Sequence, residues 1–141
     1  MQRIVVIVIL ALALALPAPA VAARSYSGDF DGAGAMSFKL VKRKGKTKVK
    51  DFEFEQVPVV CDSGAETTSG HLNFSPKVKR KKFRARGHND AGGKVRVKGK
   101  LKRKRTRAKG TFRIFGTLPT DDGGTGIDCG SGTISWSAAR G

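Results

Sequence analysis

From residue 24 onward, apolar and polar residues alternate along most of the chain, and short stretches rich in glycine and polar residues interrupt the alternation. Because successive side chains of a strand point to opposite faces, this period of two indicates half-buried β-strands. No part of this region repeats its apolar residues with the helical period. The pattern predicts strands at residues 26–30, 36–41, 51–55 with a continuation at 57–61, 72–74, 77–86, 94–102, 107–114 and 133–138. About eight short strands separated by turns predict an all-β fold, a single small antiparallel β-sandwich or barrel.

The most regular alternation lies in residues 94–113, KVRVKGKLKRKRTRAKGTFR, in which eleven of twenty residues are Lys or Arg. A disordered basic arm would show no period, whereas this stretch has a clear period of two. We expect a hairpin with a turn at residues 103–106, although a slip of two residues would keep the same faces. On its inner face Leu101 meets Ala108, Gly99 meets Gly110, Val97 meets Phe112 and Val95 meets Ile114. On its outer face Lys100 lies opposite Lys109, and Lys102 opposite Arg107.

A second hairpin is expected between residues 36–41 and 51–55, which are joined by a turn at residues 42–47. Its predicted register pairs Phe38 with Phe54, Leu40 with Phe52, and Lys39 with Glu53. Pro58 indicates a sheet edge or a bulge, because proline cannot donate a ladder hydrogen bond. Residues 62–70, 88–93 and 120–126 are expected to be loops. Val78 is out of phase with the apolar residues that follow it, which predicts a bulge near Lys81 or Lys82 in the strand 77–86.

The first 23 residues have the features of a secretory signal peptide. Arg3 provides a positive charge, residues 4–16 are all apolar, and two prolines and small residues follow. The apolar run is shorter than the roughly 20 residues that span a bilayer, which disfavours an uncleaved membrane anchor. Cleavage is expected after Ala22 or Ala23, leaving one secreted domain, residues 24–141, without a transmembrane anchor. This protein is therefore expected outside the cell or associated with the cell envelope.

The chain contains two cysteines, Cys61 and Cys129. In an oxidising compartment a disulfide between them is the default expectation. The bond would close a loop of 68 residues, which corresponds to roughly 4 kcal/mol in the chain-entropy model. A metal site or a catalytic thiol would need partner residues that are not evident nearby.

Three segments resemble small secreted β-proteins of high-GC Gram-positive bacteria: YSG at 26–28, CDSG at 61–64 and CGSGTISWSA at 129–138. In that group a cysteine beside a glycine turn, and a late Cys-x-Ser-Gly before a tryptophan strand, recur. The resemblance implies a bacterial source, the all-β fold and the disulfide. The group carries no assigned activity, so the resemblance implies no function.

The charge balance adds the strongest functional signal. Without Arg3, 27 basic residues stand against 11 acidic ones, a net charge of +16. The outer faces of the strands 77–86, 94–102 and 107–113 carry most of the localised positive charge, while the acidic residues cluster elsewhere. Like charges directly opposite one another destabilise a sheet, so salt or a polyanion must offset them. The expected polyanion-binding residues are Lys79, Arg84, Arg86, Lys94, Arg96, Lys98, Lys100, Lys102, Arg107, Lys109 and Arg113.

Secretion points to anionic polymers of the cell envelope or the extracellular space: wall phosphate polymers, extracellular DNA or acidic polysaccharide. A further hypothesis is that the protein contacts anionic lipid headgroups at a membrane surface. Phe83 and Phe112 fall in the inward phase, so base stacking and sequence reading are not expected from them. An alternative is a structural or protein-interaction module of the envelope, whose charge serves solubility.

The third hypothesis is that the protein is an enzyme. His71 and His88 are the only imidazoles, and His88-Asn89-Asp90 reads as a turn. No nucleophile elbow, phosphate loop or metal-binding histidine pair is present in the sequence. The acidic glycine loop 121–128 gathers oxygen ligands but does not have the spacing of a known calcium loop. We therefore expect no catalytic residues, no metal site and no cofactor.

Overall fold

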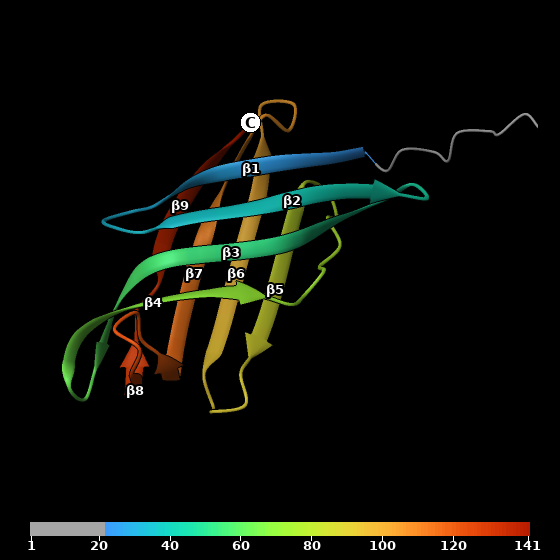
Figure 1. Cartoon of the computed structure of the whole chain (residues 1–141). Coiled ribbons are helices and arrows are strands. Elements are labelled where there is room, and N and C mark those ends of the chain that lie inside the picture. The colour runs from blue at the N-terminus through green and yellow to red at the C-terminus, as the bar shows by residue number, and fades with distance from the viewer. Residues whose placement is uncertain (1–21) are drawn as a thin grey trace, which may run out of the picture.

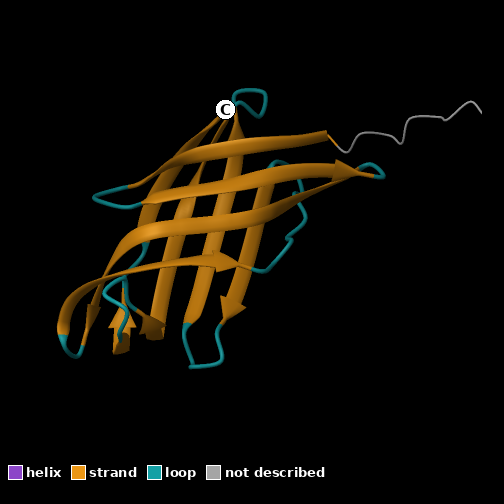
Figure 2. Ribbon diagram, in the orientation of Figure 1, coloured by secondary structure: helices purple, strands orange, loops and turns teal. Residues whose placement is uncertain are grey.

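The computed structural model describes residues 22–141, and this part of the chain is built from strands, turns and loops without a helix (Figures 1 and 2). The all-β prediction is confirmed. Within residues 22–141 there are nine strands: β1 Ala22–Phe30, β2 Ala35–Arg43, β3 Lys46–Cys61, β4 Gly64–Leu72, β5 Lys82–His88, β6 Lys94–Lys102, β7 Arg107–Pro119, β8 Thr125–Gly130 and β9 Ile134–Arg140. The predicted signal peptide lies outside the described residues, apart from Ala22 and Ala23, which begin β1. In the described part, no helix is long and apolar enough to cross a membrane.

All strand pairs are antiparallel and form one sheet in the order β4-β3-β2-β1-β9-β7-β6-β5. The sheet folds over itself, so that β1, β2, β3 and β4 form one layer and run across β9, β7, β6 and β5 in the other (Figure 1). β1 pairs with both β2 and β9 and joins the layers at one side. β8 pairs with β7 and meets β3 at Val60–Gly130, which joins the layers at a second place.

Aromatic side chains from both layers fill the space between them. Tyr26 and Phe38 stack with ring centroids 4.9 Å apart, and Phe112 lies 5.2 Å from Phe54 and 4.9 Å from Phe30. These rings are almost completely buried, and they come from the inward phase of the alternation. Burial of this apolar surface is the main favourable term for the fold.

Two glycines on the neighbouring strands β6 and β7 make room for two large rings in this core. The register places Phe83, Gly99, Gly110 and Trp136 side by side on β5, β6, β7 and β9. The rings of Phe83 and Trp136 meet with centroids 6.2 Å apart. A Cβ atom at Gly99 would lie 2.2 Å from the Phe83 ring, so the position excludes any side chain.

The predicted β6–β7 register is confirmed at every pair, including Gly99–Gly110 and Val97–Phe112. The turn contains three successive residues with left-handed backbone: Arg103, Lys104 and Arg105 have φ of 47°, 53° and 64°. The Thr106 amide and hydroxyl both donate hydrogen bonds to the Arg103 carbonyl, and the Tyr26 hydroxyl donates to the Arg105 carbonyl. The turn is thus tied to the body of the protein from β1.

The predicted register of the other hairpin is wrong. Phe54 pairs with Met36 rather than Phe38, and Leu40 pairs with Val49 rather than Phe52. The strands extend to a tight turn at Lys44–Gly45, and an irregularity between Ser37 and Lys39 shifts the pairing. Glu53 therefore pairs with Ser37. Lys39 instead forms an ion pair of 3.2 Å with Asp51, which has a left-handed φ of 51°.

The strand predicted at 77–86 begins later than expected, at Lys82. Arg80 and Lys81 have left-handed φ of 49° and 65° and form a tight turn that brings Lys79 to Lys82. The out-of-phase Val78 belongs to the segment before this turn, where Lys77 pairs with Lys48 of β3. The predicted bulge is therefore a reversal of the chain.

Two other segments also differ from the prediction, while Pro58 is placed as expected. Residues 64–72, mostly predicted as loop, form β4, whose sequence is polar because only Thr68 is buried. Residues 125–130 form β8, which the loop prediction at 120–126 missed. Pro58 follows a bulge between Phe54 and Val57, on a part of β3 that β2 no longer pairs with.

Candidate polyanion-binding face

The outward residues of β5, β6 and β7 line up in cationic rows across the three strands. Lys82 pairs with Lys100, which pairs with Lys109 on its other side; Arg86, Arg96 and Arg113 form a parallel row. Neighbouring strands lie about 4.8 Å apart, so the charges form a dense two-dimensional array. We call this the cationic face, and it consists of Lys82, Arg84, Arg86, Lys94, Arg96, Lys98, Lys100, Lys102, Arg107, Lys109 and Arg113.

The cationic face carries no carboxylate of its own. The two ion pairs found among residues 22–141, Lys39–Asp51 and His71–Glu53, involve β2, β3 and β4. All members of the face are exposed except Lys102, which is half-buried. In the described region no carboxylate forms an ion pair with the face, and Asp29 of β1 is the acidic residue beside its Lys109 end.

Charge repulsion on the face is visible at Lys102. Lys100 and then Lys109 lower the pKa of the Lys102 ammonium below its ordinary value, with smaller contributions from desolvation and from Lys82. A neighbouring like charge lowers a lysine pKa because it disfavours the protonated form. An anion placed over these residues would relieve that repulsion.

Ten of the eleven residues predicted for polyanion binding lie together on this face, and Lys79 does not. Lys79 lies in the segment before the Arg80–Lys81 turn. The strand β5 begins after this turn, so its first outward cation is Lys82 and not Lys79. The alternation cannot distinguish a bulge from a reversal, because both shift the phase. The four consecutive cations at residues 79–82 include no apolar residue that would fix the phase.

One aromatic side chain on this face was not predicted. Phe115 is half-buried on β7, opposite Lys94, with the guanidinium carbon of Arg113 4.9 Å and that of Arg96 5.6 Å from its ring centroid. Such cation–π contacts hold the two guanidinium groups near the ring. Phe115 has the same phase as Arg113, so extending the predicted strand beyond residue 114 would have found it.

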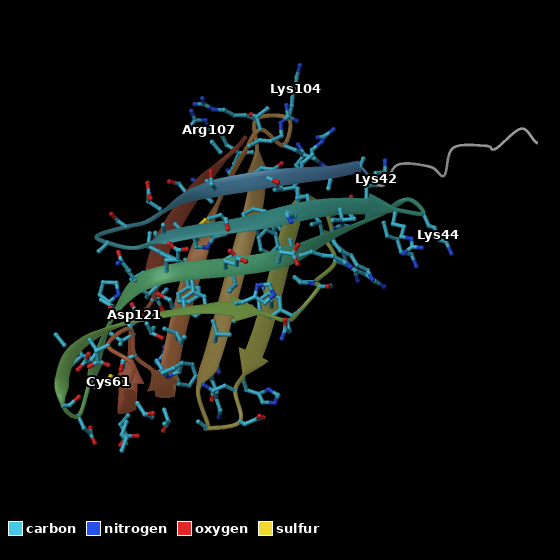
Figure 3. The ribbon with its side chains drawn as sticks, in the orientation of Figure 1. Lys42, Lys44, Cys61, Lys104, Arg107 and Asp121 are labelled. Carbon is cyan, nitrogen blue, oxygen red and sulfur yellow. A yellow bond between two sulfur atoms is a disulfide. The ribbon has the colours of Figure 1, made fainter. Side chains whose placement is uncertain are left out.

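A second group of cations lies at the end of the β2–β3 hairpin, which projects from the layer of β1 to β4 (Figure 3). Lys42 and Lys44 mark this end in Figure 3, and the loop residue Lys77 pairs with Lys48 beside it. We call this group the hairpin tip, and it consists of Lys42, Arg43, Lys44, Lys46 and Lys48. It is a smaller set of five cations that lies on a different part of the molecule from the cationic face.

The acidic loop lies far from Lys104 and Arg107 in Figure 3, where Asp121 appears near Cys61. The Asp122 carboxylate accepts hydrogen bonds from the Thr120 hydroxyl and, at 2.9 Å, from the Gly124 amide. These bonds hold the pKa of Asp122 below its ordinary value. Among residues 22–141 no group of three or more His, Cys, Asp or Glu side chains lies close enough to hold a metal ion.

The predicted disulfide is present. Cys61 of β3 and Cys129 of β8 are bonded, and both are almost fully buried. A Cβ at Gly126 would lie 2.4 Å from the Cys129 sulfur and 2.6 Å from the Cys61 sulfur. The glycine loop before Cys129 therefore has a packing role at the bond.

His71, one of the two candidate imidazole bases, lies near a carboxylate. Its Nδ1 lies 3.6 Å from Glu53 Oε1, across the β3–β4 pair, and both side chains are about half exposed. His88 lies on β5, opposite Lys94.

Comparisons with known proteins returned no matching family model, no matching curated protein and no matching solved structure.

Proposed function

We propose that this protein is secreted and that its cationic face binds anionic polymers of the bacterial cell envelope or the extracellular space by electrostatic attraction. The observation that carries the proposal is the row Lys82–Lys100–Lys109, in which three lysines lie opposite one another without a carboxylate on the face. A polymer that replaces the small counterions around these charges gains free energy from their release.

The chemistry of the face favours phosphate or carboxylate repeats over a specific sequence of bases. Its cations are spread over three strands, and its single aromatic ring, Phe115, is already engaged by two guanidinium groups. Point charges at this spacing suit a diffuse attraction to wall phosphate polymers, acidic polysaccharide or DNA backbone.

The test is retention of the mature protein on purified wall polymer, heparin and duplex DNA across a salt gradient. In the face variant, Lys98, Lys100, Lys109 and Arg113 are all replaced by Gln. In the matched control, Lys42, Arg43, Lys44 and Lys46 of the hairpin tip are replaced by Gln, so both variants have the same net charge.

We expect the face variant to elute at lower salt than the control. On duplex DNA, loss of four phosphate contacts reduces the slope of log affinity against log salt by at most about 3.6. Equal losses in both variants would show that net charge alone, and no particular face, determines binding. Elution of the unmodified protein with a neutral reference protein would instead favour a structural or protein-interaction module.

A further inference from the structure

The sheet is open along one side, between the edge strands β4 and β5. These strands end the order of paired strands, and no ladder joins them in the described structure. A pocket of about 520 Å³ lies there, lined by residues of β3, β4, β5, β6 and β7, by the segment that follows β4 and by the turn between β5 and β6. This volume is within the range of small-molecule sites, roughly 300–1,000 Å³.

The floor of the pocket is apolar. Four lining residues come from the buried core: Phe54, Val95, Ile114 and Leu118. Leu72 and Phe74 are partly buried residues that also line it and pack against this core. A ligand with a hydrocarbon or aryl body would find nonpolar contacts from both layers.

Glycines let the two edge strands lie close to the floor of the pocket. Gly70 of β4 faces the Phe54 ring, and a Cβ there would lie 2.8 Å from Cζ of that ring. A Cβ at Gly87 of β5 would lie 3.0 Å from Val95 Cγ1 and 3.6 Å from the Phe74 ring. Both strands thus approach the floor more closely than any residue with a side chain would allow.

The rim of the pocket is predominantly positive. Arg86 and Lys94 line it from β5 and β6, and the two imidazoles of His71 and His88 lie on the two edge strands. Asp90 is the one carboxylate among the lining residues of the described chain. An apolar floor below two permanent cations suits a ligand with an apolar body and an anionic head.

We propose that this pocket binds a small amphipathic anion, whose hydrocarbon or aryl body lies on the apolar floor and whose carboxylate or phosphate head lies at Arg86 and Lys94. The ligand is a free fatty acid or a lipid phosphate. The pocket shares Arg86 and Lys94 with the cationic face, but Lys82, Lys100 and Lys109 do not line it.

The binding test uses isothermal titration calorimetry with laurate, dodecyl phosphate and dodecyltrimethylammonium, each below its micelle concentration. We expect one saturable site for the two anions and none for the cation of the same chain length. Shortening laurate to decanoate removes two methylenes and weakens binding by roughly sixteenfold, if each buried methylene contributes about fourfold. The tighter of laurate and dodecyl phosphate identifies the head group; equal binding of the cationic amphiphile would overturn the proposal.

The position of the site is tested by variants and by NMR. Leu72→Trp places a large ring in the pocket mouth and should weaken laurate binding at least tenfold. Val60→Trp is the matched control, because Val60 is 67% exposed and does not line the pocket. In the unmodified protein, laurate should shift the amide signals of Gly70 and Gly87, which gives a result even if Leu72→Trp fails to fold. Shifts confined to β6 and β7 around Lys100 would overturn the proposal.

A double comparison separates this site from the polymer-binding face. Lys100→Gln with Lys109→Gln should weaken polymer retention and leave laurate affinity within about twofold, while Leu72→Trp should do the reverse. Loss of both laurate and polymer binding in the Lys100/Lys109 variant, with neither lost in Leu72→Trp, would show that laurate binds at the lysine row and would overturn the pocket. A protein that binds laurate but no polymer would refute the proposed function and retain the pocket.

Discussion

Lys100 and Lys109 lie directly opposite each other on β6 and β7, and Lys82 continues the same row on β5. The sheet keeps this unfavourable arrangement because the residues beside these lysines fit on the inner face, where Gly99 pairs with Gly110 and Leu101 with Ala108. Core packing fixes the register, and the outward charges follow from it.

Relief of this repulsion should stabilise the protein. Lys100→Thr removes the central charge of the row and places a β-branched residue in a strand, so we expect a melting temperature a few degrees higher in low-salt buffer. The gain should shrink as salt screens the remaining charges. Lys42→Thr is the control, because Lys42 pairs with Thr47 and has no cation directly opposite on β3. Equal gains in both variants, measured by differential scanning calorimetry, would contradict the row-specific explanation.

Substitution of Gly99 by alanine should destabilise the core. The added Cβ would lie 2.2 Å from the Phe83 ring, which cannot withdraw because it packs against Trp136. Overpacking of this kind costs about 1–3 kcal/mol in the free energy of unfolding. Gly130→Ala is the matched control, since its Cβ would have no atom within 4 Å. Urea unfolding curves that coincide for the two variants would refute this role of Gly99.

Loss of the disulfide should lower stability without changing the strand content at moderate temperature. Replacing Cys61 and Cys129 by Ser frees a loop of 68 residues in the unfolded chain, which costs up to roughly 4 kcal/mol. The bond holds β3 to β8 at the second junction of the layers, so we expect β8 to open first. Hydrogen exchange should therefore become faster at residues 125–130 than at residues 94–102. Uniform acceleration across both strands would contradict local opening.

Titration of the single tyrosine gives a prediction for alkaline pH. Burial raises the pKa of Tyr26 above its ordinary value of 10.0, although Arg24, Arg140 and Arg105 lower it in part. The unfolded chain therefore loses this proton first as the pH rises. The contribution of Tyr26 is constant below pH 10.0 and declines between that value and the higher pKa of the folded state.

The measurement compares the unfolding free energy of the unmodified protein with that of Tyr26→Phe across this range. The comparison is needed because Lys102 changes the free energy of unfolding in the opposite direction. Its lowered pKa destabilises the folded state at lower pH, and this loss disappears as the pH rises toward 10.5. Tyr26→Phe also loses the hydrogen bond to Arg105, worth about 1 kcal/mol at all pH values below the titration. A difference that stays flat through the alkaline range would contradict the raised pKa.

Processing of the N-terminus is directly measurable. We expect mass spectrometry of the protein from culture medium to give a chain that begins at Ala23 or Arg24, because the small residues before these positions suit signal peptidase. An Arg3→Glu change in the n-region should reduce the secreted amount. Recovery of the full chain only in the cell fraction would refute secretion.

The sequence was most informative where inner apolar residues match across a short turn. Val95, Val97 and Leu101 each find a partner of suitable size on β7, so the β6–β7 register could be predicted. The β2–β3 register depends on left-handed residues such as Asp51, and alternation contains no signal for them. β4 escaped prediction because it buries only Thr68 and its polar residues look like those of a loop.

Residues of the candidate face were predicted correctly wherever the strand that carries them was predicted correctly. Residues of β6 and β7 were placed correctly because their phase is fixed by buried neighbours, whereas Lys79 was misplaced where cations alone determine the phase. The pocket between β4 and β5 could not be predicted, because its lining comes from five strands and requires the sheet order.

Positive charge gathers at one end of the layer of β9, β7, β6 and β5, and acidic residues lie away from that end. This separation affects how the molecule approaches a ligand. The turn after β6 contains Arg103, Lys104 and Arg105, whereas the turn before β6 contains Asp90, and Asp121 lies on the far side of the molecule from Lys104 (Figure 3). Such a distribution makes the protein an electric dipole in addition to a polycation. In the field of a polyanion it experiences a torque that turns the β6–β7 end forward, within a range of about 10 Å at 0.1 M salt. If the protein binds a polyanion as proposed, its orientation at encounter would be set before any side chain makes contact.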